Sequence, residues 1–368
     1  MVESLRTRRE PFNTTGKSVG RNARPDASGI LLTMASPRPA AAASEPLVHF
    51  DQITGRAVLI APRRQTRPHD ADLVRELGED PSAWCPFCGG NEARTPPAVL
   101  QAPAAPVTAW QARIVPNRYP FVEACPTAAG CGTAAERPAH GIHEVLVESP
   151  RHDTSVAAIE PGGWRAAWQL AQRRLAMLAE RNDLAWGTVF KNSGPMAGAS
   201  LEHVHSQLVA IDFIPPAISH EFAAAARRTD PFADLLAEAD KARRVVTRSE
   251  GMVALVPPAP RQPCEIWILP ERQEAFFHAA GPERASGIAD LTRDLVGRLA
   301  RVLPGADFNW WLHEAAWGDH PAAATTDRWH WHLEILPRAT PLAGFELGTG
   351  CHISAVPPDE AAARLRDA

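Results

Sequence analysis

Residues 192–207 read NSGPMAGASLEHVHSQ, and this stretch decides how the rest of the chain is interpreted. It begins with small residues, including Gly194 and Gly198, and it ends in a run that carries His203, His205 and Gln207 at alternate positions. Side chains at alternate positions of a strand point to the same face of the sheet. The stretch therefore predicts a glycine-rich loop followed by a strand that presents two imidazoles and an amide to one surface.

A loop and a strand of this kind suit chemistry at a phosphate group. The backbone N–H groups of a loop of small residues can bind phosphate oxygens. A neutral imidazole can attack phosphorus as a nucleophile, and imidazole is largely neutral near pH 7. We interpret His205 and Gln207 as catalytic candidates, with a purely structural role for the histidines as the alternative.

A second local motif, WCPFCGG at residues 84–90, points to a metal. Two cysteines separated by two residues, with glycines after them, form half of a tetrahedral zinc site. A redox pair of the thioredoxin type is the first alternative, but that motif should follow a strand and open a helix, whereas Pro, Gly and Asn surround it here. Unliganded thiols are the second alternative. Zinc at Cys85 and Cys88 is the interpretation that we favour.

The order of predicted elements repeats once along the chain. In the first half, a strand that ends in Pro150 is followed by a long helix, a strand ending at residues 190–192, a loop and His203-x-His205-x-Gln207. In the second half, a strand that ends in Pro270 is followed by the same series, which ends in His330-x-His332-x-Glu334. Blocks of strands and long helices favour an α+β fold with antiparallel sheets and flanking helices. We expect a disordered extension at residues 1–44, a first repeat at 45–245 and a second repeat at 246–368.

Periodicity places the individual elements. Apolar residues at helical spacing predict helices over 161–180, over 217–245 with a break near Pro231, and over 281–302. Short apolar runs predict a hairpin at 47–60 and strands at 144–148, 187–190, 203–211, 252–256, 265–269, 309–312 and 329–336.

Composition excludes several classes of protein. Hydrophobic residues make up 45% of the 368 residues and charged residues 22%, which is ordinary for a globular chain and unlike a disordered one. No run of apolar residues is long enough to predict a membrane span. The net charge of −4 gives no overall attraction to nucleic acid or to an anionic membrane. The six cysteines are too few for a disulfide scaffold, and we expect a reducing, cytoplasmic location.

The motifs together resemble the galactose-1-phosphate uridylyltransferase family of the histidine-triad superfamily. The resemblance runs from Leu47 to Arg364 and rests on residues 85–88, 116–120, 148–152, 190–192, 198–207 and 344–346. It implies two histidine-triad-like α+β repeats, a homodimer, and transfer of a nucleoside monophosphate through a nucleotidyl-histidine. The run Glu346-Leu-Gly-Thr-Gly350 is more similar to an ADP-glucose phosphorylase-like branch of the family.

The resemblance also implies roles for single residues. His205 is the nucleophile that it implies, and Gln207 holds a phosphate oxygen. The implied structural zinc ligands are Cys85, Cys88, His152 and His203. The implied contacts to the nucleotide sugar are Arg64, Arg67, Asn117, Asn192, Gly198 and Ser200. A second metal, zinc or iron, is implied at Glu221, His313, His330 and His332, with a polar cluster among tryptophans as the alternative.

We therefore expect an enzyme that moves a nucleoside monophosphate, UMP in the first instance, between a nucleotide sugar and a hexose 1-phosphate, as in galactose metabolism. Gln207 stands where histidine-triad hydrolases have a third histidine, and an amide cannot pass on the proton that activates water, so transfer is favoured over hydrolysis. A nucleotide-sugar phosphorylase that uses inorganic phosphate is the alternative within enzymes. A non-catalytic, zinc-stabilised nucleotide-binding protein is the alternative of another class.

Overall fold

A computed structural model describes residues 45–67, 80–103, 109–125, 135–318, 320 and 326–368. The predicted extension at residues 1–44 lies outside these residues. Antiparallel ladders join all of the strands in the described part of the chain, and long helices flank them. The α+β prediction is confirmed.

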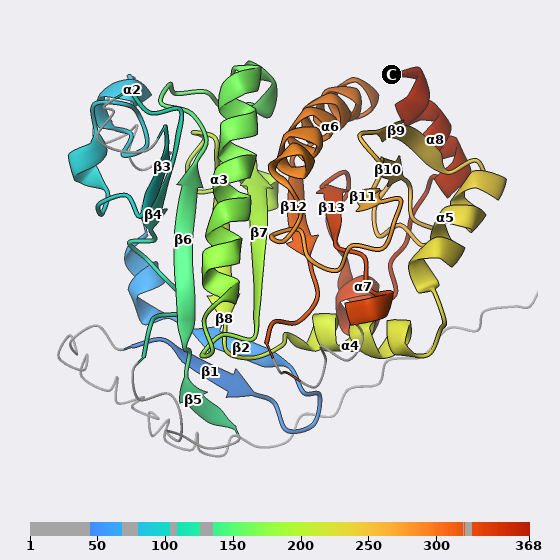
Figure 1. The fold of residues 1–368 in the computed structure, drawn as a ribbon, viewed down its shortest axis with the longest axis horizontal. Helices are drawn as coiled ribbons and strands as arrows, with labels where there is room; N and C mark the ends of the chain where they lie inside the picture. The colour runs from blue at the N-terminus through green and yellow to red at the C-terminus, as the bar shows by residue number, and fades with distance from the viewer. Residues whose placement is uncertain (1–44, 68–79, 104–108, 126–134, 319, 321–325) are drawn as a thin grey trace, which may run out of the picture. The chain divides into compact units, whose positions relative to one another are not determined.

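One sheet of ten strands holds most of the described chain together (Figure 1). Its order is β3 (Leu100–Ala102), β4 (Ala112–Pro116), β6 (Gly141–Val147), β8 (His205–Ile211), β7 (Trp186–Ser193), β12 (Phe308–His313), β13 (His332–Pro337), β11 (Ile266–Pro270), β10 (Met252–Leu255) and β9 (Val245–Ser249).

The sheet order reads the same from both ends. From the centre outward, β7, β8, β6, β4 and β3 on one side correspond to β12, β13, β11, β10 and β9 on the other. The two sets meet where β7 and β12 pair, with Asn192 opposite Asn309. This arrangement is what two copies of one unit would give, although the boundary expected between residues 245 and 246 falls inside β9 and stays a prediction.

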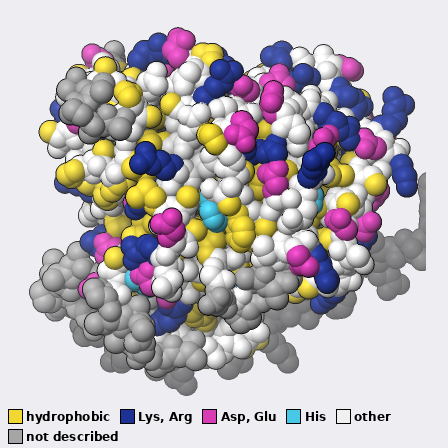
Figure 2. Space-filling model, in the orientation of Figure 1, with side chains coloured by type: hydrophobic (Ala, Val, Ile, Leu, Met, Phe, Trp, Pro, Cys, Tyr) yellow, Lys and Arg dark blue, Asp and Glu magenta, His cyan; other side chains and the backbone are white. Residues whose placement is uncertain are grey.

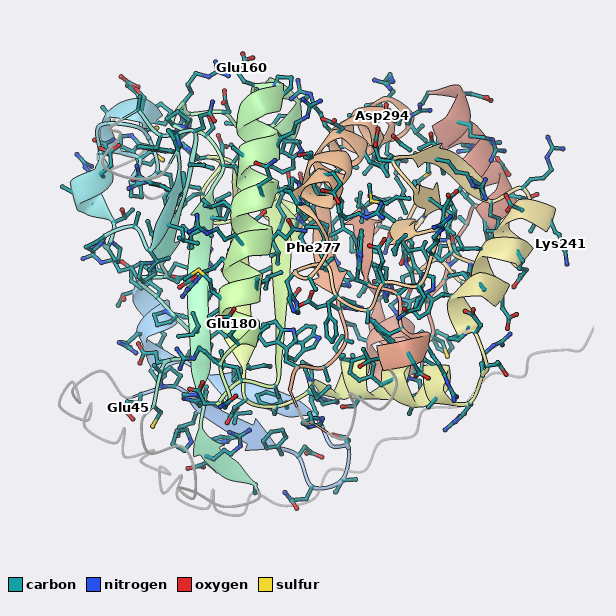
Figure 3. All side chains as sticks on the ribbon, viewed as in Figure 1. Glu45, Glu160, Glu180, Lys241, Phe277 and Asp294 are labelled. Carbon is teal, nitrogen blue, oxygen red and sulfur yellow. The ribbon has the colours of Figure 1, made fainter. Side chains whose placement is uncertain are left out.

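Two long helices cover one face of this sheet. Helices α3 (Pro161–Ala179) and α6 (Pro282–Val302) each begin with proline, whose fixed φ suits the first helical turn. They lie side by side in front of the sheet, and in Figure 3 Phe277 lies between them. The Trp164 indole N–H of α3 donates to the Ala289 carbonyl of α6 at 2.9 Å. Alternate strand residues such as Leu208 and Leu333 are fully buried in this layer.

The other face carries the polar residues of interest and a thinner cover. Over it lie the small sheet β2 (Ala57–Ile60), β1 (Leu47–Phe50) and β5 (Glu136–Pro138), together with α4 (Pro216–Ala226) and α5 (Pro231–Lys241). The predicted hairpin is confirmed, because Leu47 pairs with Ile60. The short α2 (Pro81–Trp84) precedes the cysteine motif, and α7 (Gly344–Thr349) and α8 (Pro358–Asp367) close the chain.

Several predicted boundaries were wrong. Strand β6 begins at Gly141 and not at residue 144, and β13 begins at His332 and not at residue 329. Two further differences concern β8 and α5. Strand β8 begins at His205 and not at residue 203, because the Val204 N–H donates to the Asp153 carbonyl at 2.8 Å, and only the Val204 carbonyl still bonds the β6 side, from the Glu148 N–H at 3.4 Å. His203 therefore precedes the strand that carries His205 and Gln207. The helix expected to reach residue 245 ends at Lys241, and residues 245–249 form β9 instead.

The surface agrees with the charge balance of the sequence. Figure 2 shows basic and acidic side chains intermixed over α6 and α8. None of the helices in the described residues has the length and apolar character needed to span a membrane.

Candidate active site

The glycine loop between β7 and β8 is built to a specific shape. Gly194 and Gly198 both have positive φ, +88° and +83°, which glycine adopts without strain. A Cβ on Gly194 would lie 1.9 Å from a carboxylate oxygen of Asp307. That carboxylate accepts the Met196 N–H at 2.6 Å, so a residue of the second half of the chain fixes the loop of the first half.

Four side chains converge beside this loop into a cluster with zinc-ligand chemistry. The two cysteines lie after α2, and His152 and His203 lie in loops next to the ends of β6 and β8. The distance from Cys85 Sγ to His203 Nδ1 is 3.5 Å, and that from Cys88 Sγ to His152 Nδ1 is 3.4 Å. Zinc bonds of about 2.0–2.3 Å put tetrahedral ligand atoms about 3.3–3.8 Å apart, so the spacing fits the ion.

The surroundings of the cluster also fit a metal. His203 Nε2 lies 2.9 Å from the Ser149 carbonyl oxygen, which holds the proton on Nε2 and directs the Nδ1 lone pair to the cluster. Burial raises the pKa of Cys85 to about 12 and also raises that of Cys88, so a cation is what would hold these sulfurs as thiolates here. The residues predicted as zinc ligands are thus brought together by the fold.

His205 begins β8, and its hydrogen bonding leaves one ring nitrogen free. Its Nδ1 lies 2.7 Å from the His203 carbonyl oxygen, an acceptor that places the proton on Nδ1 and leaves the lone pair on Nε2. Burial lowers the pKa of His205 to about 3, and the charges of Lys191 and Arg67 act in the same direction. The ring packs 5.2 Å from that of Phe87. A neutral imidazole with a free Nε2 lone pair can attack an electrophile.

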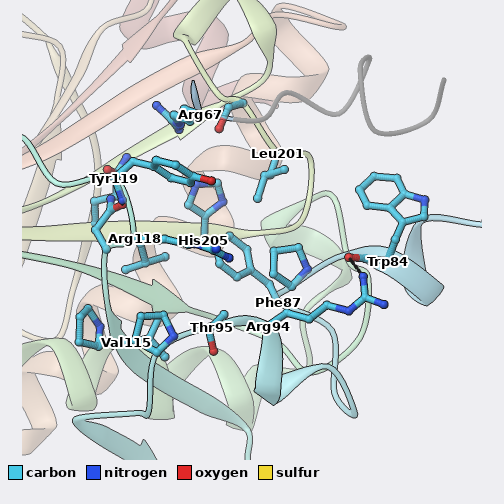
Figure 4. A pocket seen from close by; sticks show the side chains of 17 residues that line it. Arg67, Trp84, Phe87, Arg94, Thr95, Val115, Arg118, Tyr119, Leu201 and His205 are labelled. Carbon is cyan, nitrogen blue, oxygen red and sulfur yellow. Dashed lines mark hydrogen bonds between the residues drawn. The ribbon is translucent and has the colours of Figure 1, made fainter. Parts of the chain in front are cut away.

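A cavity of about 430 Å³ opens over His205 (Figure 4). In Figure 4, Arg67 and Arg94 lie toward opposite ends of the lining, with His205 between them. Of the predicted site residues, the lining includes Arg67, Asn117, Ser200, His205 and Gln207. Aromatic side chains and prolines make up much of the remaining wall, which is typical of a small-molecule binding site.

The other predicted substrate residues lie near this cavity but outside its lining. The Arg64 guanidinium donates to the Tyr119 carbonyl at 2.9 Å and so supports the wall. Asn192 lines an adjoining cavity of about 250 Å³, which also contacts His205. Its side-chain oxygen accepts a hydrogen bond from Asn309 at 2.9 Å. Gly198 ends the short 3-10 turn Pro195–Ala197 within the loop and lines neither cavity.

A second cluster lies at the corresponding place in the other half of the sheet. Ligand atoms of Glu221, His313 and His332 lie within 4.8 Å of one another. Glu221 Oε2 and His313 Nδ1 are buried and face each other at 3.0 Å without hydrogen-bond alignment, as two ligands of one ion would. His330 is not among the residues whose ligand atoms converge, because its ring is held in a stack on Phe232 at 5.0 Å, with Nδ1 directed to the Pro270 carbonyl at 3.1 Å.

Several supporting residues were not predicted from the sequence. Lys191 is buried behind His205, where its Nζ donates to Glu148 at 2.5 Å and to the His205 carbonyl at 2.9 Å. Burial lowers the pKa of this lysine. His143 lies 2.9 Å from Gln207, and Asp307 and Asn309 support the glycine loop. The only sequence signal for Lys191 was its place beside Asn192 at the end of a strand.

Two family descriptions match the chain. "Galactose-1-phosphate uridyl transferase, N-terminal domain" matches residues 41–215, and "Domain of unknown function (DUF4921)" matches residues 162–368. The chain is 30% identical over 334 residues to ADP-glucose phosphorylase of Arabidopsis thaliana, a match that covers 88% of this chain and 93% of that protein. It is 23% identical over 336 residues to galactose-1-phosphate uridylyltransferase of Thermotoga maritima, covering 87% of this chain and 98% of that protein.

Solved structures agree with these matches. The structure of an ADP-glucose phosphorylase from Arabidopsis thaliana with bound ADP-glucose superimposes with a TM-score of 0.70 at 27% identity, covering 88% of this chain and 99% of that one. A uridylyltransferase structure also gives a TM-score of 0.70, at 23% identity over 87% of this chain and 97% of that one, and supports the fold.

Proposed function

Because the chain belongs to the galactose-1-phosphate uridylyltransferase family, we propose that it transfers a nucleoside monophosphate from a nucleotide sugar to a phosphate-bearing acceptor through His205. The single observation that carries the proposal is the hydrogen bond from His205 Nδ1 to the His203 carbonyl. It directs the Nε2 lone pair away from the backbone at a residue that lines the large cavity.

In the first half-reaction, His205 Nε2 forms a bond to the α-phosphorus, and the bond from that phosphorus to the bridging oxygen of the sugar phosphate breaks. The sugar 1-phosphate leaves with the electron pair of that bond. The imidazole gains a positive charge, and its Nδ1–H stays hydrogen-bonded to the His203 carbonyl. Arg67 lies in the same lining, where it would stabilise phosphate charge, as in-line phosphoryl transfer requires.

In the second half-reaction, a phosphate oxygen of the acceptor attacks the same phosphorus and the bond to Nε2 breaks. His205 returns to its neutral form with no net change in protonation. Gln207 has an amide that can donate to a phosphate oxygen but cannot relay a proton from water. This difference favours a phosphate acceptor over hydrolysis.

Zinc at Cys85, Cys88, His152 and His203 would have a structural role. Its ligands close a tetrahedral site with no position for substrate, and His203 is two residues from the nucleophile. The second cluster, Glu221, His313 and His332, offers one carboxylate and two imidazoles, which suit zinc or iron. It lies in the other half of the sheet and takes no part in the proposed steps.

For the substrate, we favour ADP-glucose with inorganic phosphate as acceptor, so that the products are glucose 1-phosphate and ADP. Identity to the plant ADP-glucose phosphorylase is 30%, against 23% to the Thermotoga uridylyltransferase, and residues 348–350 resemble the phosphorylase branch. Transfer of UMP to a hexose 1-phosphate, as in galactose metabolism, is the second candidate. The homodimer and the cytoplasmic location stay predictions.

Intact mass measurement tests the proposal. The zinc-loaded protein is incubated with ADP-glucose or with UDP-glucose, without acceptor, and we expect an adduct of one AMP from the first. The adduct should be absent in His205→Ala and present in His220→Ala, a matched change at an exposed histidine of α4. Inorganic phosphate should then release ADP. A protein that forms no adduct with either nucleotide sugar would contradict the proposal, and a UMP adduct alone would select the second candidate.

A further inference from the structure

His143 is a buried histidine on β6 that the steps above do not use, and it touches the active site. Its side chain is 4% exposed. Its Nε2 lies 2.9 Å from Gln207 Oε1, on the neighbouring strand β8. On the other side of the ring, the Phe121 backbone N–H points to Nδ1 at 3.3 Å, and the Phe121 ring packs 4.1 Å away.

These contacts determine which nitrogen of His143 carries the proton. A backbone N–H can only donate, so Nδ1 must offer its lone pair to Phe121. Burial lowers the pKa of His143 to about 3, and the charges of Arg64 and Arg67 act in the same direction, so the ring is neutral near pH 7. A neutral ring with a free Nδ1 carries its proton on Nε2. The Nε2–H then donates to the Gln207 side-chain carbonyl.

The direction of this hydrogen bond sets the direction of the Gln207 amide. With its Oε1 held by His143, the amide turns its NH₂ group away from His143, and Gln207 lines the cavity together with His205. An amide NH₂ attracts a phosphate oxygen, whereas an amide carbonyl repels it. We propose that His143 is a positioning residue that fixes the Gln207 amide with its NH₂ group, and not its carbonyl, toward the phosphate. This inference rests on the proposed function.

A second amide is placed by the same ring. Asn117 Oδ1 accepts the Tyr119 N–H at 2.8 Å, which leaves Asn117 Nδ2 3.0 Å from His143 Nε2. Since Nε2 already carries a proton, it has no lone pair for that amide. The Asn117 NH₂ group must donate to another acceptor, and Asn117 lines the cavity. One neutral tautomer thus leaves two amide donors for a phosphate or a ribose.

Two conservative variants separate the two sides of the His143 ring. His143→Asn places a polar atom near the Nδ1 position, so it keeps an acceptor for Phe121 and loses the donor to Gln207. His143→Gln reaches the Nε2 position and keeps that donor. We expect His143→Asn to slow nucleotidyl-enzyme formation from ADP-glucose about 10–100-fold at saturating substrate, with KM changed less than about 3-fold. Removing one oriented donor costs about 100–1000-fold, and this variant releases the orientation of the donor but keeps the amide. His143→Gln should stay within about 3-fold of the unsubstituted protein.

A double-mutant cycle with Gln207→Ala provides the readout that a merely structural role would not move. If His143 acts through Gln207, His143→Asn slows the Gln207→Ala protein less than about 3-fold further. His140→Asn is the matched control, because His140 is equally buried and bonds Asp183 and Cys125 away from the cavity. The proposal would be overturned if His143→Asn and His143→Gln slowed nucleotidyl-enzyme formation equally. It would also be overturned if the rate loss of His143→Asn were as large in the Gln207→Ala protein as in the unsubstituted protein. If either result occurs while the unsubstituted protein forms the adduct normally, only the role of His143 is overturned and the proposed function stands. If the unsubstituted protein forms no adduct, both proposals are overturned.

Discussion

Lys191 and Glu148 form a buried ion pair whose removal makes a quantitative prediction. Their side chains are about 2% and 1% exposed. Lys191 Nζ donates to Glu148 Oε2 at 2.5 Å, and the second oxygen of Glu148 accepts the Ser206 hydroxyl at 2.5 Å. The substitution Lys191→Met keeps the length of the side chain and removes the charge, so the Glu148 carboxylate stays buried with one of its two partners lost.

Breaking one side of a buried pair costs about 3–5 kcal/mol. With about 2.1 cal/mol/K of unfolding entropy per residue, a chain of 368 residues loses roughly 1.3 °C of Tm per kcal/mol. We therefore expect Lys191→Met to lower Tm by roughly 4–6 °C in calorimetry of the zinc-loaded protein. Adding Glu148→Leu should recover at least half of that loss, because removing both charges also removes the uncompensated carboxylate.

The matched control is Lys241→Met, the same substitution on the exposed last turn of α5, where Figure 3 shows the side chain at the edge of the molecule. It should change Tm by less than about 1 °C. The reasoning is refuted if Lys191→Met melts within 1 °C of the unsubstituted protein, or if the double variant is no more stable than Lys191→Met alone.

Three further predictions concern the metal cluster, the loop and pH. A strong chelator should lower Tm by several degrees, because the ion contributes to folding free energy through its ligands. The chelator should have no such effect on Cys88→Ser, which lacks one ligand. Elemental analysis that finds no zinc in a stable protein contradicts this prediction. Gly194→Ala should lower nucleotidyl-enzyme formation at least 10-fold with the fold retained by circular dichroism, since its Cβ meets Asp307 at 1.9 Å, whereas Gly90→Ala, also at positive φ but with open space around its Cβ, should not. Between pH 7 and 4.5 an unfolded chain protonates His143 near its usual pKa of about 6.5, whereas the folded protein, in which the His143 pKa is about 3, does not, so the free energy of unfolding falls as the pH drops. His143→Gln should remove about 2–3 kcal/mol of that fall in urea unfolding. Equal pH slopes for both proteins would contradict the assignment.

The sequence predicted the features that are local or periodic. Amphipathic spacing and initial prolines located α3 and α6 within a residue or two. The Cys85-x-x-Cys88 spacing identified half of the metal cluster. Its other half, His152 and His203, came from a family resemblance, because nothing local to those residues indicates a ligand more than 60 positions away.

The features that failed or were missed depend on contacts between distant segments. Strand β8 starts at His205 because a loop residue, Asp153, captures the Val204 N–H, and no strand pattern records such a competitor. His330 precedes His332 by two residues, as His203 precedes His205, but its ring stacks on Phe232 and its ligand atoms do not reach the second cluster. The sequence did not single out His143, which lies just before the predicted strand at 144–148, and its contact with Gln207 follows only from the pairing of β6 with β8.

The pairing of β7 with β12 has a consequence for how this chain can change. Each strand is the open edge of its own half, and each would present a row of unpaired backbone groups if the other half were absent. Asp307 and Asn309 at the start of β12 also hold the glycine loop of the first half. The second half therefore supplies a pairing strand and a loop support to the half that carries His205, and two separately expressed halves would have to form the same β7–β12 pairing between two chains.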